Sequence, residues 1–407
     1  MTDEAPAVTP RAVPTVNDLE VTGRRVLLRV DFNVPMHEGS IVDDRRIRAA
    51  LPTIRSLRDR GARVVVVTHL GRPKGTVKPE LTVAPLARHL GELLGIDVPV
   101  ATDVVGESAR QLVAAMHDGD VVMLENVRFE PGEEANDPAM ARQLAALADV
   151  YVNDAFGTAH RAHASTEGVA HLLPSAAGLL MARELEALGS VLNDARPPVV
   201  AILGGAKVSS KLGVLTNLME RVDDLFIGGA MACTFLRAQG LEAGRSALAD
   251  DQVDVARGVL EHAQRGRCTL HLPVDVVVAE SATEGAATEV VPCTAIPAER
   301  VVVDIGPLTV AAIAAAVGSA GTVVWNGPLG IYEIDAFGEG TRAVARELGK
   351  SSAKTVVGGG DLAAALDRTG LSDGIDWVST GGGATLEYLE GRQLPGVVAL
   401  TGSVSVH

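Results

Sequence analysis

The chain has 407 residues, of which 47% are apolar and 21% charged, and its formal net charge is −15. This length predicts two or three domains, and the acidic charge argues against a general nucleic-acid binder. No run of about 18 apolar residues is present to span a membrane, and three cysteines without CxxC spacing argue against a disulfide or zinc framework.

The chain begins with a stretch that we expect to be a flexible leader, residues 1–15. It contains Asp3, Glu4 and three prolines, and it lacks the basic-then-apolar order of a signal peptide. We therefore expect a cytoplasmic protein with no membrane partner.

Short β-branched runs follow, with room for a helix between successive runs. Because the runs are almost continuously apolar, they predict parallel strands covered on both faces, with right-handed crossovers. In the first half they are Val26–Val30, Val64–Thr68, Val98–Ala101, Val121–Leu124 and Val150–Asn153. Helical spacing of apolar residues lies between them, for example over Ile47–Leu57 and Asp137–Ala148.

This pattern predicts the domain boundary at a helix with a proline-rich end, over residues 180–196. Pro197 and Pro198 then precede a fresh apolar run, which marks a restart of the chain. The runs of the second half are Val199–Leu203, Asp224–Ile227, Val274–Ala279, Val301–Asp304, Thr322–Trp325, Thr355–Val357 and Trp377–Thr380. We predict an α/β protein with two doubly wound parallel-sheet domains, residues 16–179 and 197–396, joined by a hinge helix.

Basic and polar residues cluster in the first half. Between Arg24 and Lys78 there are 13 lysines and arginines against five acidic residues. Polar clusters also stand at or just beyond strand ends. Arg46, Arg72, Arg128 and Arg161 would trap a small polyanion if they converged, because guanidinium groups bind phosphate and carboxylate oxygens in pairs. The alternative is a solvated basic face.

Glycine-rich turns follow five runs of the second half. They begin at Gly204, Gly228, Gly327, Gly358 and Gly381. Glycine lets the backbone approach a ligand closely, and the start of the following helix offers N–H groups to an anion. Five such turns at one edge of a sheet favour a phosphate-binding site.

The residues around these turns indicate which kind of phosphate ligand the site binds. Gly349–Ser351 fails as a Walker A loop, because Val344 stands where the first glycine should be. Gly358–Ala363 fits a dinucleotide fingerprint, but Asp361 would repel a bare pyrophosphate. A bridging Mg²⁺ removes that conflict, so Asp361 favours a metal–nucleotide complex. Lys207 and Lys211, one helical turn apart, are placed to meet phosphate charge.

Seven motifs in the same order make the chain resemble the phosphoglycerate kinase family from Val26 to Val404. They are Arg29–Pro35 (RVDFNVP), His69–Pro73 (HLGRP), Asn153–His163 (NDAFGTAHRAH), Gly204–Val208 (GGAKV), Trp325–Gly330 (WNGPLG), Gly358–Asp361 (GGGD) and Ser379–Gly383 (STGGG). The resemblance implies two Rossmann-like domains, a C-terminal tail (397–407) packed on the first domain, and a monomer. It also implies reversible transfer between 1,3-bisphosphoglycerate and ADP, in line and with closure of the domains.

The resemblance also implies roles for individual residues. The phosphorylated acid would bind Asp31, Phe32, Asn33, Arg46, His69, Leu70, Gly71, Arg72, Arg128, His160 and Arg161. ADP or ATP would bind Gly205, Lys207, Lys211, Asn326, Pro328, Glu333, Gly359, Gly360, Asp361 and Leu362, with Mg²⁺ at Asp361. The catalytic groups would be Arg46, Lys207, Gly360 and Gly383.

Two other functions remain as alternatives. A non-catalytic, nucleotide-binding relative is suggested by Leu362, where the family usually has Ser or Thr, and by Ala230, where a third glycine is common. A dinucleotide-dependent dehydrogenase is suggested by Gly358–Ala363 alone, and it explains neither the arginines nor Lys207.

Overall fold

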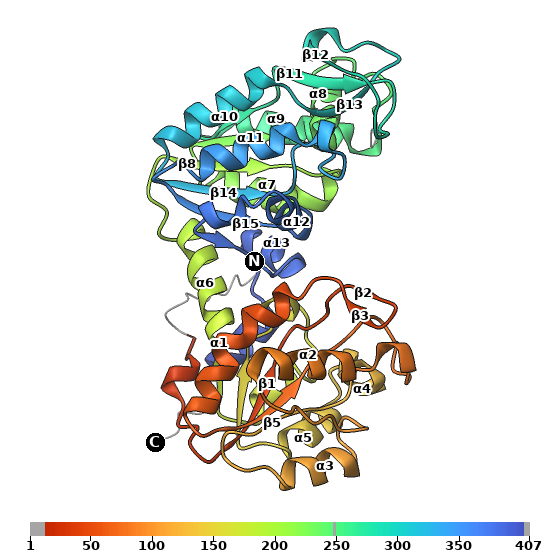
Figure 1. Ribbon diagram of the computed structural model, residues 1–407. Helices are drawn as coiled ribbons and strands as arrows, with labels where there is room; N and C mark the ends of the chain where they lie inside the picture. The colour runs from red at the N-terminus through yellow and green to blue at the C-terminus, as the bar shows by residue number, and fades with distance from the viewer. Residues whose placement is uncertain (1–12, 247–249, 403–407) are drawn as a thin grey trace. The chain divides into compact units, whose positions relative to one another are not determined.

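The computed structural model describes residues 13–246 and 250–402, which form two compact units (Figure 1). The first unit runs to Glu186 and takes in the chain again from Gln393, and the second is Ala187–Arg392. Most of the predicted leader and the last five residues of the predicted tail lie outside the described residues. Among the residues described, no helix combines the length and apolar character needed to cross a membrane.

The first unit is built on a five-stranded parallel sheet in the order β5-β4-β1-β6-β7. The chain adds β4 and then β5 on one side of β1, and afterwards β6 and β7 on its other side. The direction in which strands are added therefore reverses between β1 and β6. The strands are β1 (Arg25–Arg29), β4 (Arg63–Val67), β5 (Val121–Met123), β6 (Val150–Asn153) and β7 (Ser175–Ala177), with a small hairpin of β2 (Met36–His37) and β3 (Ser40–Ile41).

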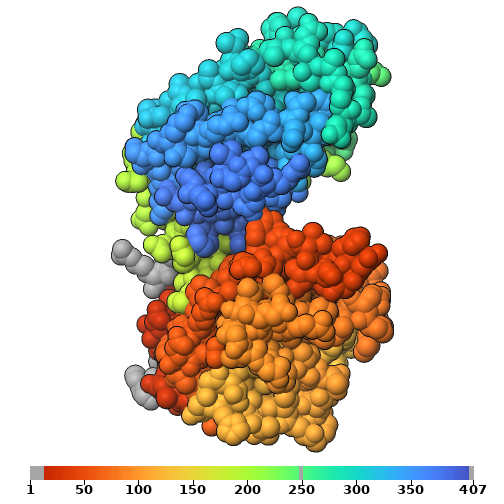
Figure 2. Space-filling model, in the orientation of Figure 1, coloured from red at the N-terminus to blue at the C-terminus, as the bar shows by residue number. Residues whose placement is uncertain are grey.

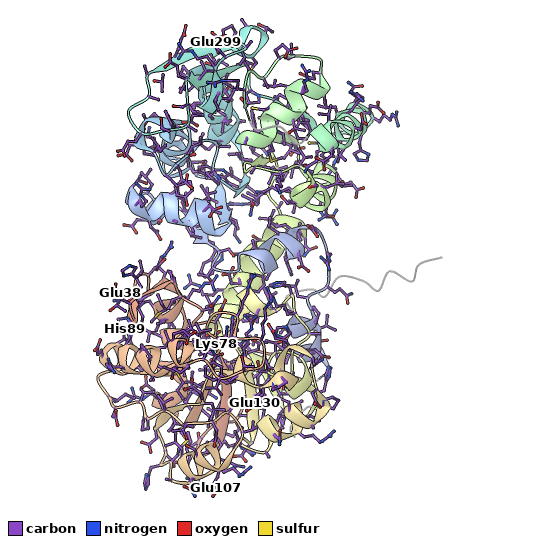
Figure 3. The ribbon with its side chains drawn as sticks, turned by 90° about the vertical axis from the view of Figure 1, so that its right-hand side faces the viewer. Glu38, Lys78, His89, Glu107, Glu130 and Glu299 are labelled. Carbon is purple, nitrogen blue, oxygen red and sulfur yellow. The ribbon has the colours of Figure 1, made fainter. Side chains whose placement is uncertain are left out.

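Helices cover this sheet, and the two-residue period of the strands decides which side chains meet them. Val26 and Leu28 of β1 lie in one buried cluster with Ile54 of α1 and Leu90 of α2. Figure 3 labels His89 on α2 and Glu107 on α3, on the outside of this unit. The helices are α1 (Arg45–Asp59), α2 (Ala84–Leu94), α3 (Glu107–Ala114), α4 (Pro131–Glu134), α5 (Pro138–Ala145) and α14 (Pro395–Thr401).

The second unit repeats this plan with a six-stranded parallel sheet in the order β10-β9-β8-β14-β15-β16. The reversal of strand order falls between β8 and β14, and ligands bind at such points in open α/β sheets. The strands are β8 (Val199–Leu203), β9 (Asp224–Ile227), β10 (Thr269–His271), β14 (Thr322–Asn326), β15 (Lys354–Gly358) and β16 (Trp377–Val378).

Helices again pack on the sheet of the second unit, and side chains close over it in the view of Figure 2. Trp325 of β14 is fully buried in a cluster with Ile313 of α10, Val344 of α11 and Leu362 of α12. The helices are α7 (Leu212–Met219), α8 (Ala230–Ala238), α9 (Val253–Arg265), α10 (Pro307–Ser319), α11 (Glu339–Leu348), α12 (Gly360–Arg368) and α13 (Gly383–Leu389). Helix α6 (Leu179–Leu192) begins in the first unit and ends in the second.

The prediction of two doubly wound parallel sheets is confirmed, but three of the predicted strands differ. Two of them form a separate antiparallel sheet with β12 (Thr288–Pro292), namely β11 (Asp275–Ala279) and β13 (Val301–Ile305). The run at 98–101 contributes only a bridge from Val100 to Met123. Pro99 interrupts that run, and proline has no N–H to donate to a ladder.

Candidate active site

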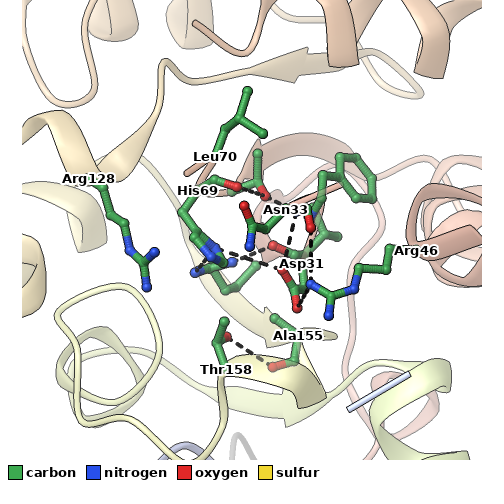
Figure 4. A network of polar contacts seen from close by, with 12 residues as sticks. Asp31, Asn33, Arg46, His69, Leu70, Arg128, Ala155 and Thr158 are labelled. Atoms are coloured by element: carbon green, nitrogen blue, oxygen red, sulfur yellow. Dashed lines mark hydrogen bonds and ion pairs between the residues drawn. The ribbon is translucent and has the colours of Figure 1, made fainter. Parts of the chain in front are cut away.

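The carboxyl end of β1 holds the first group of predicted site residues. Arg46, in the first turn of α1, donates from Nη1 to Asp31 Oδ2 at 2.9 Å and to the Asn33 carbonyl at 3.2 Å (Figure 4). The Asp31 side chain is 11% exposed and that of Arg46 is 34% exposed, so the carboxylate is shielded from water while the guanidinium remains accessible. The loop after β1 therefore fixes where the Arg46 guanidinium stands.

The loop after β4 joins the same group through backbone and amide contacts. Asn33 Oδ1 accepts from the Gly71 N–H at 2.9 Å, and Arg128 Nη1 donates to the Gly71 carbonyl at 2.8 Å. The side chains of Phe32 and Leu70 are buried among apolar residues, so they anchor their loops rather than face a ligand.

His69 and Arg161 are brought toward this group, whereas Arg72 is not joined to it. Burial, together with the positive charges of Arg29, Arg128, Arg46 and Arg161, lowers the pKa of His69 well below its usual value. Arg161 Nε donates to His160 Nε2 at 3.2 Å. Arg72 is exposed and makes no hydrogen bond or ion pair with the described residues.

Three further residues of this unit matter, and none was assigned a role from the sequence. Asp154 Oδ1 accepts from the N–H groups of Leu180 and Met181 at 2.9 and 3.1 Å, and so holds the first turn of α6. Burial raises its pKa to about 6. Arg29 and Glu133 are fully buried behind the site. Arg29 and Asp154 lie in two of the sequence motifs, but only the fold reveals what these side chains contact.

In the second unit, the glycine turns meet at the reversal between β8 and β14. A Cβ added to Gly204 would lie 2.0 Å from the Pro328 carbonyl oxygen, and one added to Gly229 would lie 2.5 Å from Gly205 N. These turns touch backbone to backbone, which only glycine permits. The prediction that five turns line one edge of a single sheet is confirmed.

Lys211 and Asn326 stand at the centre of these turns. Lys211 Nζ donates to Asn326 Oδ1 at 2.5 Å and to the Asn326 carbonyl at 3.1 Å. Burial lowers the pKa of Lys211 to about 8, although the nearby Asp361 acts to raise it. Asn326 Nδ2 is buried and has no hydrogen-bond partner among the described residues. An unpaired buried donor beside a lysine fits a site that binds an anion.

A pocket of about 380 Å³ opens beside these turns. Of the predicted nucleotide-binding residues, Gly205, Pro328, Glu333 and Asp361 line it. Lys207 is exposed. Leu362 is fully buried in the core, so only its backbone is available to a ligand. Gly359 precedes α12, Gly360 begins it, and Gly383 begins the short helix α13.

The residues at this pocket fit a magnesium ion that is carried by a nucleotide. Asp361 is exposed in the first turn of α12 and lines the pocket. No group of three or more His, Cys, Asp or Glu among the described residues is arranged to hold a metal. Mg²⁺ is commonly held by one or two carboxylates together with substrate phosphates and water, which a single aspartate satisfies.

Asp304 of β13 lines this pocket as well, beside the carboxyl groups of Glu333 and Asp361, and it gives a pH-dependent prediction. It accepts from the Gly340 and Ile305 N–H groups, yet burial dominates and raises its pKa to about 7. The folded protein favours the protonated form of this carboxyl, so Asp304 contributes fully to the free energy of unfolding below the unfolded-state pKa of about 4. This contribution is lost as the pH rises from about 4 to about 7, because the folded state must then give up a proton that it holds more tightly than the unfolded chain does.

We expect carbon-13 NMR of the Asp304 carboxyl to show a titration midpoint near 7. An anion bound in this pocket should move the midpoint higher, because a nearby negative charge disfavours the carboxylate. Asp304→Asn identifies the signal by removing it. A midpoint near 4 would contradict the burial argument.

Together, the two doubly wound sheets, the basic cluster and the glycine-lined pocket are features of a nucleotide-dependent phosphotransferase. The family model described as Phosphoglycerate kinase matches residues 16–392. The chain is 56% identical over 389 residues to a curated phosphoglycerate kinase of Pelotomaculum thermopropionicum, covering 96% of this chain and 99% of that one. Identity to the Moorella thermoacetica enzyme is 54%, covering 95% and 98% of the two chains.

Structural similarity agrees with these matches. The solved structure of phosphoglycerate kinase from Coxiella burnetii has a TM-score of 0.88 and 43% identity, covering 96% of this chain and 99% of that chain. The chain belongs to the phosphoglycerate kinase family.

Proposed function

We propose that this enzyme reversibly transfers a phosphoryl group from 1,3-bisphosphoglycerate to ADP, giving 3-phosphoglycerate and ATP. The observation that carries the proposal is family membership along 16–392, which includes both sheets and all their polar strand ends. The phosphorylated acid binds at the basic cluster of the first unit. The nucleotide binds at the glycine turns and pocket of the second.

The chemistry needs positioning and charge neutralisation rather than a general base. The carboxylate of 3-phosphoglycerate has a pKa near ~4 and is already ionised at neutral pH. Phosphoryl transfer then depends on in-line alignment and on neutralising the oxygens of the transferring group. Arg46, Lys207 and the helix starts at Gly360 and Gly383 supply positive charge and N–H donors for this. Mg²⁺ bound with the nucleotide at Asp361 would neutralise phosphate oxygens.

A coupled assay tests the proposed function. Purified enzyme is given 3-phosphoglycerate and MgATP, and formation of 1,3-bisphosphoglycerate is read as consumption of NADH by a coupling dehydrogenase. We expect turnover that requires both substrates. Tight binding of ADP without turnover would favour the non-catalytic, nucleotide-binding relative. Binding of NADH by the enzyme without kinase turnover would favour a dehydrogenase.

The two substrates bind to different units in this proposal, so transfer requires them to come together and exclude water. We expect small-angle scattering to show a smaller radius of gyration when 3-phosphoglycerate and MgADP are both present than with either alone. An unchanged radius with both ligands at saturation would contradict closure. Scattering of the enzyme saturated with each single ligand is the control.

A further inference from the structure

A buried arginine contacts the histidine of the basic cluster from behind. Arg29 is the last residue of β1 and is 1% exposed, and His69, just beyond β4, is 3% exposed. Arg29 Nη2 lies 3.3 Å from His69 Nδ1. Figure 4 shows His69 between Arg128 on one side and Asp31 on the other.

All three nitrogens of the Arg29 guanidinium have a partner, and Nη2 is the one that faces His69. Its Nε donates to Ser165 Oγ at 2.9 Å, and its Nη1 donates to the Val30 carbonyl. Ser165 Oγ in turn donates to Glu133 Oε1 at 2.6 Å, and the Ser165 N–H donates to Glu133 Oε2 at 2.9 Å. These contacts leave Nη2 aimed at the imidazole, and turning the guanidinium away would break buried hydrogen bonds.

This arrangement decides which ring nitrogen of His69 carries the proton. A guanidinium has only donors, so the nitrogen that faces Arg29 Nη2 must accept. A proton on Nδ1 would meet the Arg29 N–H head-on. The nearest carboxylate oxygen, Asp31 Oδ1, is 3.8 Å from Nδ1, which is too far for a hydrogen bond. The proton of the neutral ring therefore lies on Nε2.

Burial and the surrounding charges keep the ring neutral. Burial is the largest cause that lowers the pKa of His69, and the positive charges of Arg29, Arg128, Arg46 and Arg161 lower it further. Asp31 faces it with opposite charge but is already paired with Arg46. A protonated His69 ring would add a fifth positive charge to these four guanidinium groups, and their repulsion disfavours it.

We propose that Arg29 is a positioning residue that fixes His69 as the neutral Nε2–H tautomer, and so presents a hydrogen-bond donor to an oxygen of the phosphorylated acid. The tautomer stands on the geometry alone, and the identity of the acceptor rests on the proposed function. A fully ionised phosphate or carboxylate oxygen accepts but does not donate. The opposite tautomer would turn a lone pair toward it and repel it.

Nitrogen-15 NMR of the ligand-free protein tests the tautomer directly. We expect His69 to show a protonated Nε2 and an unprotonated Nδ1 at neutral pH, with the signal assigned by its loss in His69→Gln. Arg29→Lys keeps the positive charge but loses the guanidinium group with its several N–H donors. Ser165→Ala removes the hydroxyl that accepts from Arg29 Nε and so removes one of the contacts that hold the guanidinium. Both should increase the Nδ1–H population and raise KM for 3-phosphoglycerate about tenfold with a smaller change in kcat.

Ser175→Ala is the matched control, because Ser175 is also a buried serine of this unit and donates to the Ala170 and Leu173 carbonyls. Its loss should leave the His69 signals and KM unchanged. A protonated Nδ1 in the wild type would overturn the proposal, as would His69 signals unaltered in both Arg29→Lys and Ser165→Ala. If 3-phosphoglycerate does not shift the Nε2–H signal of an enzyme that is active in the coupled assay, the donor role is overturned while the proposed function stands.

Discussion

Replacing Arg46 by alanine is expected to lower kcat by about 10²–10³-fold, the usual cost of removing one donor to transition-state charge. The Asp31 and Asn33 contacts hold the guanidinium in place before substrate arrives. In the proposed reaction it would therefore supply positive charge without reorganisation as charge develops on the transferring group. Ground-state binding should change less, because other basic groups of the cluster remain.

Lys207→Ala should have a similar effect from the nucleotide side, since Lys207 is exposed next to the turn that carries Gly205. Turnover is measured in the coupled assay, and the dissociation constants of 3-phosphoglycerate and MgADP by calorimetry. Arg48→Ala is the control, because Arg48 shares α1 with Arg46 but forms an exposed pair with Asp44. Equal losses in affinity and unchanged kcat would refute the transition-state role of either residue.

The strands that the sequence predicts well are those buried on both faces. The run predicted at Val64–Thr68 is β4 (Arg63–Val67, RVVVV), which lies between β5 and β1 and has four of its five residues buried. β7 reads Ser-Ala-Ala and carries no β-branched signal. β12 lies at the edge of its sheet with four of its five residues exposed, so its register depends on its partner.

The site residues likewise include some that the sequence predicts and some that it does not. Groups at strand ends, such as Asp31 and Gly205, can be predicted because parallel strands bring their carboxyl ends to one edge. The contact of Arg29 with Ser165 joins residues 136 positions apart, so no local sequence pattern predicts it. The sequence predicts Asp304 only as the end of a strand, and its place in the pocket depends on how the antiparallel sheet packs.

The structure also shows what several of the excess basic residues between Arg24 and Lys78 contact. Arg25 pairs with Asp149 at 2.6 Å and Arg63 with Asp118 at 2.8 Å, both acids outside that segment. Arg60 donates to the Val16 carbonyl at 2.8 Å. Several of these cations thus support the fold of the first unit, and a local count of charge overstates what is available to a ligand.

Glu133→Gln is expected to reduce the free energy of unfolding of the first unit by about 3–5 kcal/mol, the cost of removing one partner from a buried charge network. Glu133 is fully buried and accepts both hydrogen bonds of Ser165, which holds Arg29. An uncharged amide leaves the Arg29 charge without its balancing carboxylate. Glu107→Gln, at an exposed pair with Arg110, should cost about 0–1 kcal/mol.

The measurement must report on the first unit, and both tryptophans, Trp325 and Trp377, lie in the second. Hydrogen exchange at the β1 amides is therefore the suitable probe. Burial acts to raise the pKa of Glu133, but its bonds to His163 and Ser165 and the Arg29 charge outweigh burial and lower it. The stability that Glu133 adds is thus present above a pH of about 4.3 and is lost as the pH falls further. Equal β1 protection in wild type and Glu133→Gln at neutral pH would show that the buried carboxylate does not balance Arg29.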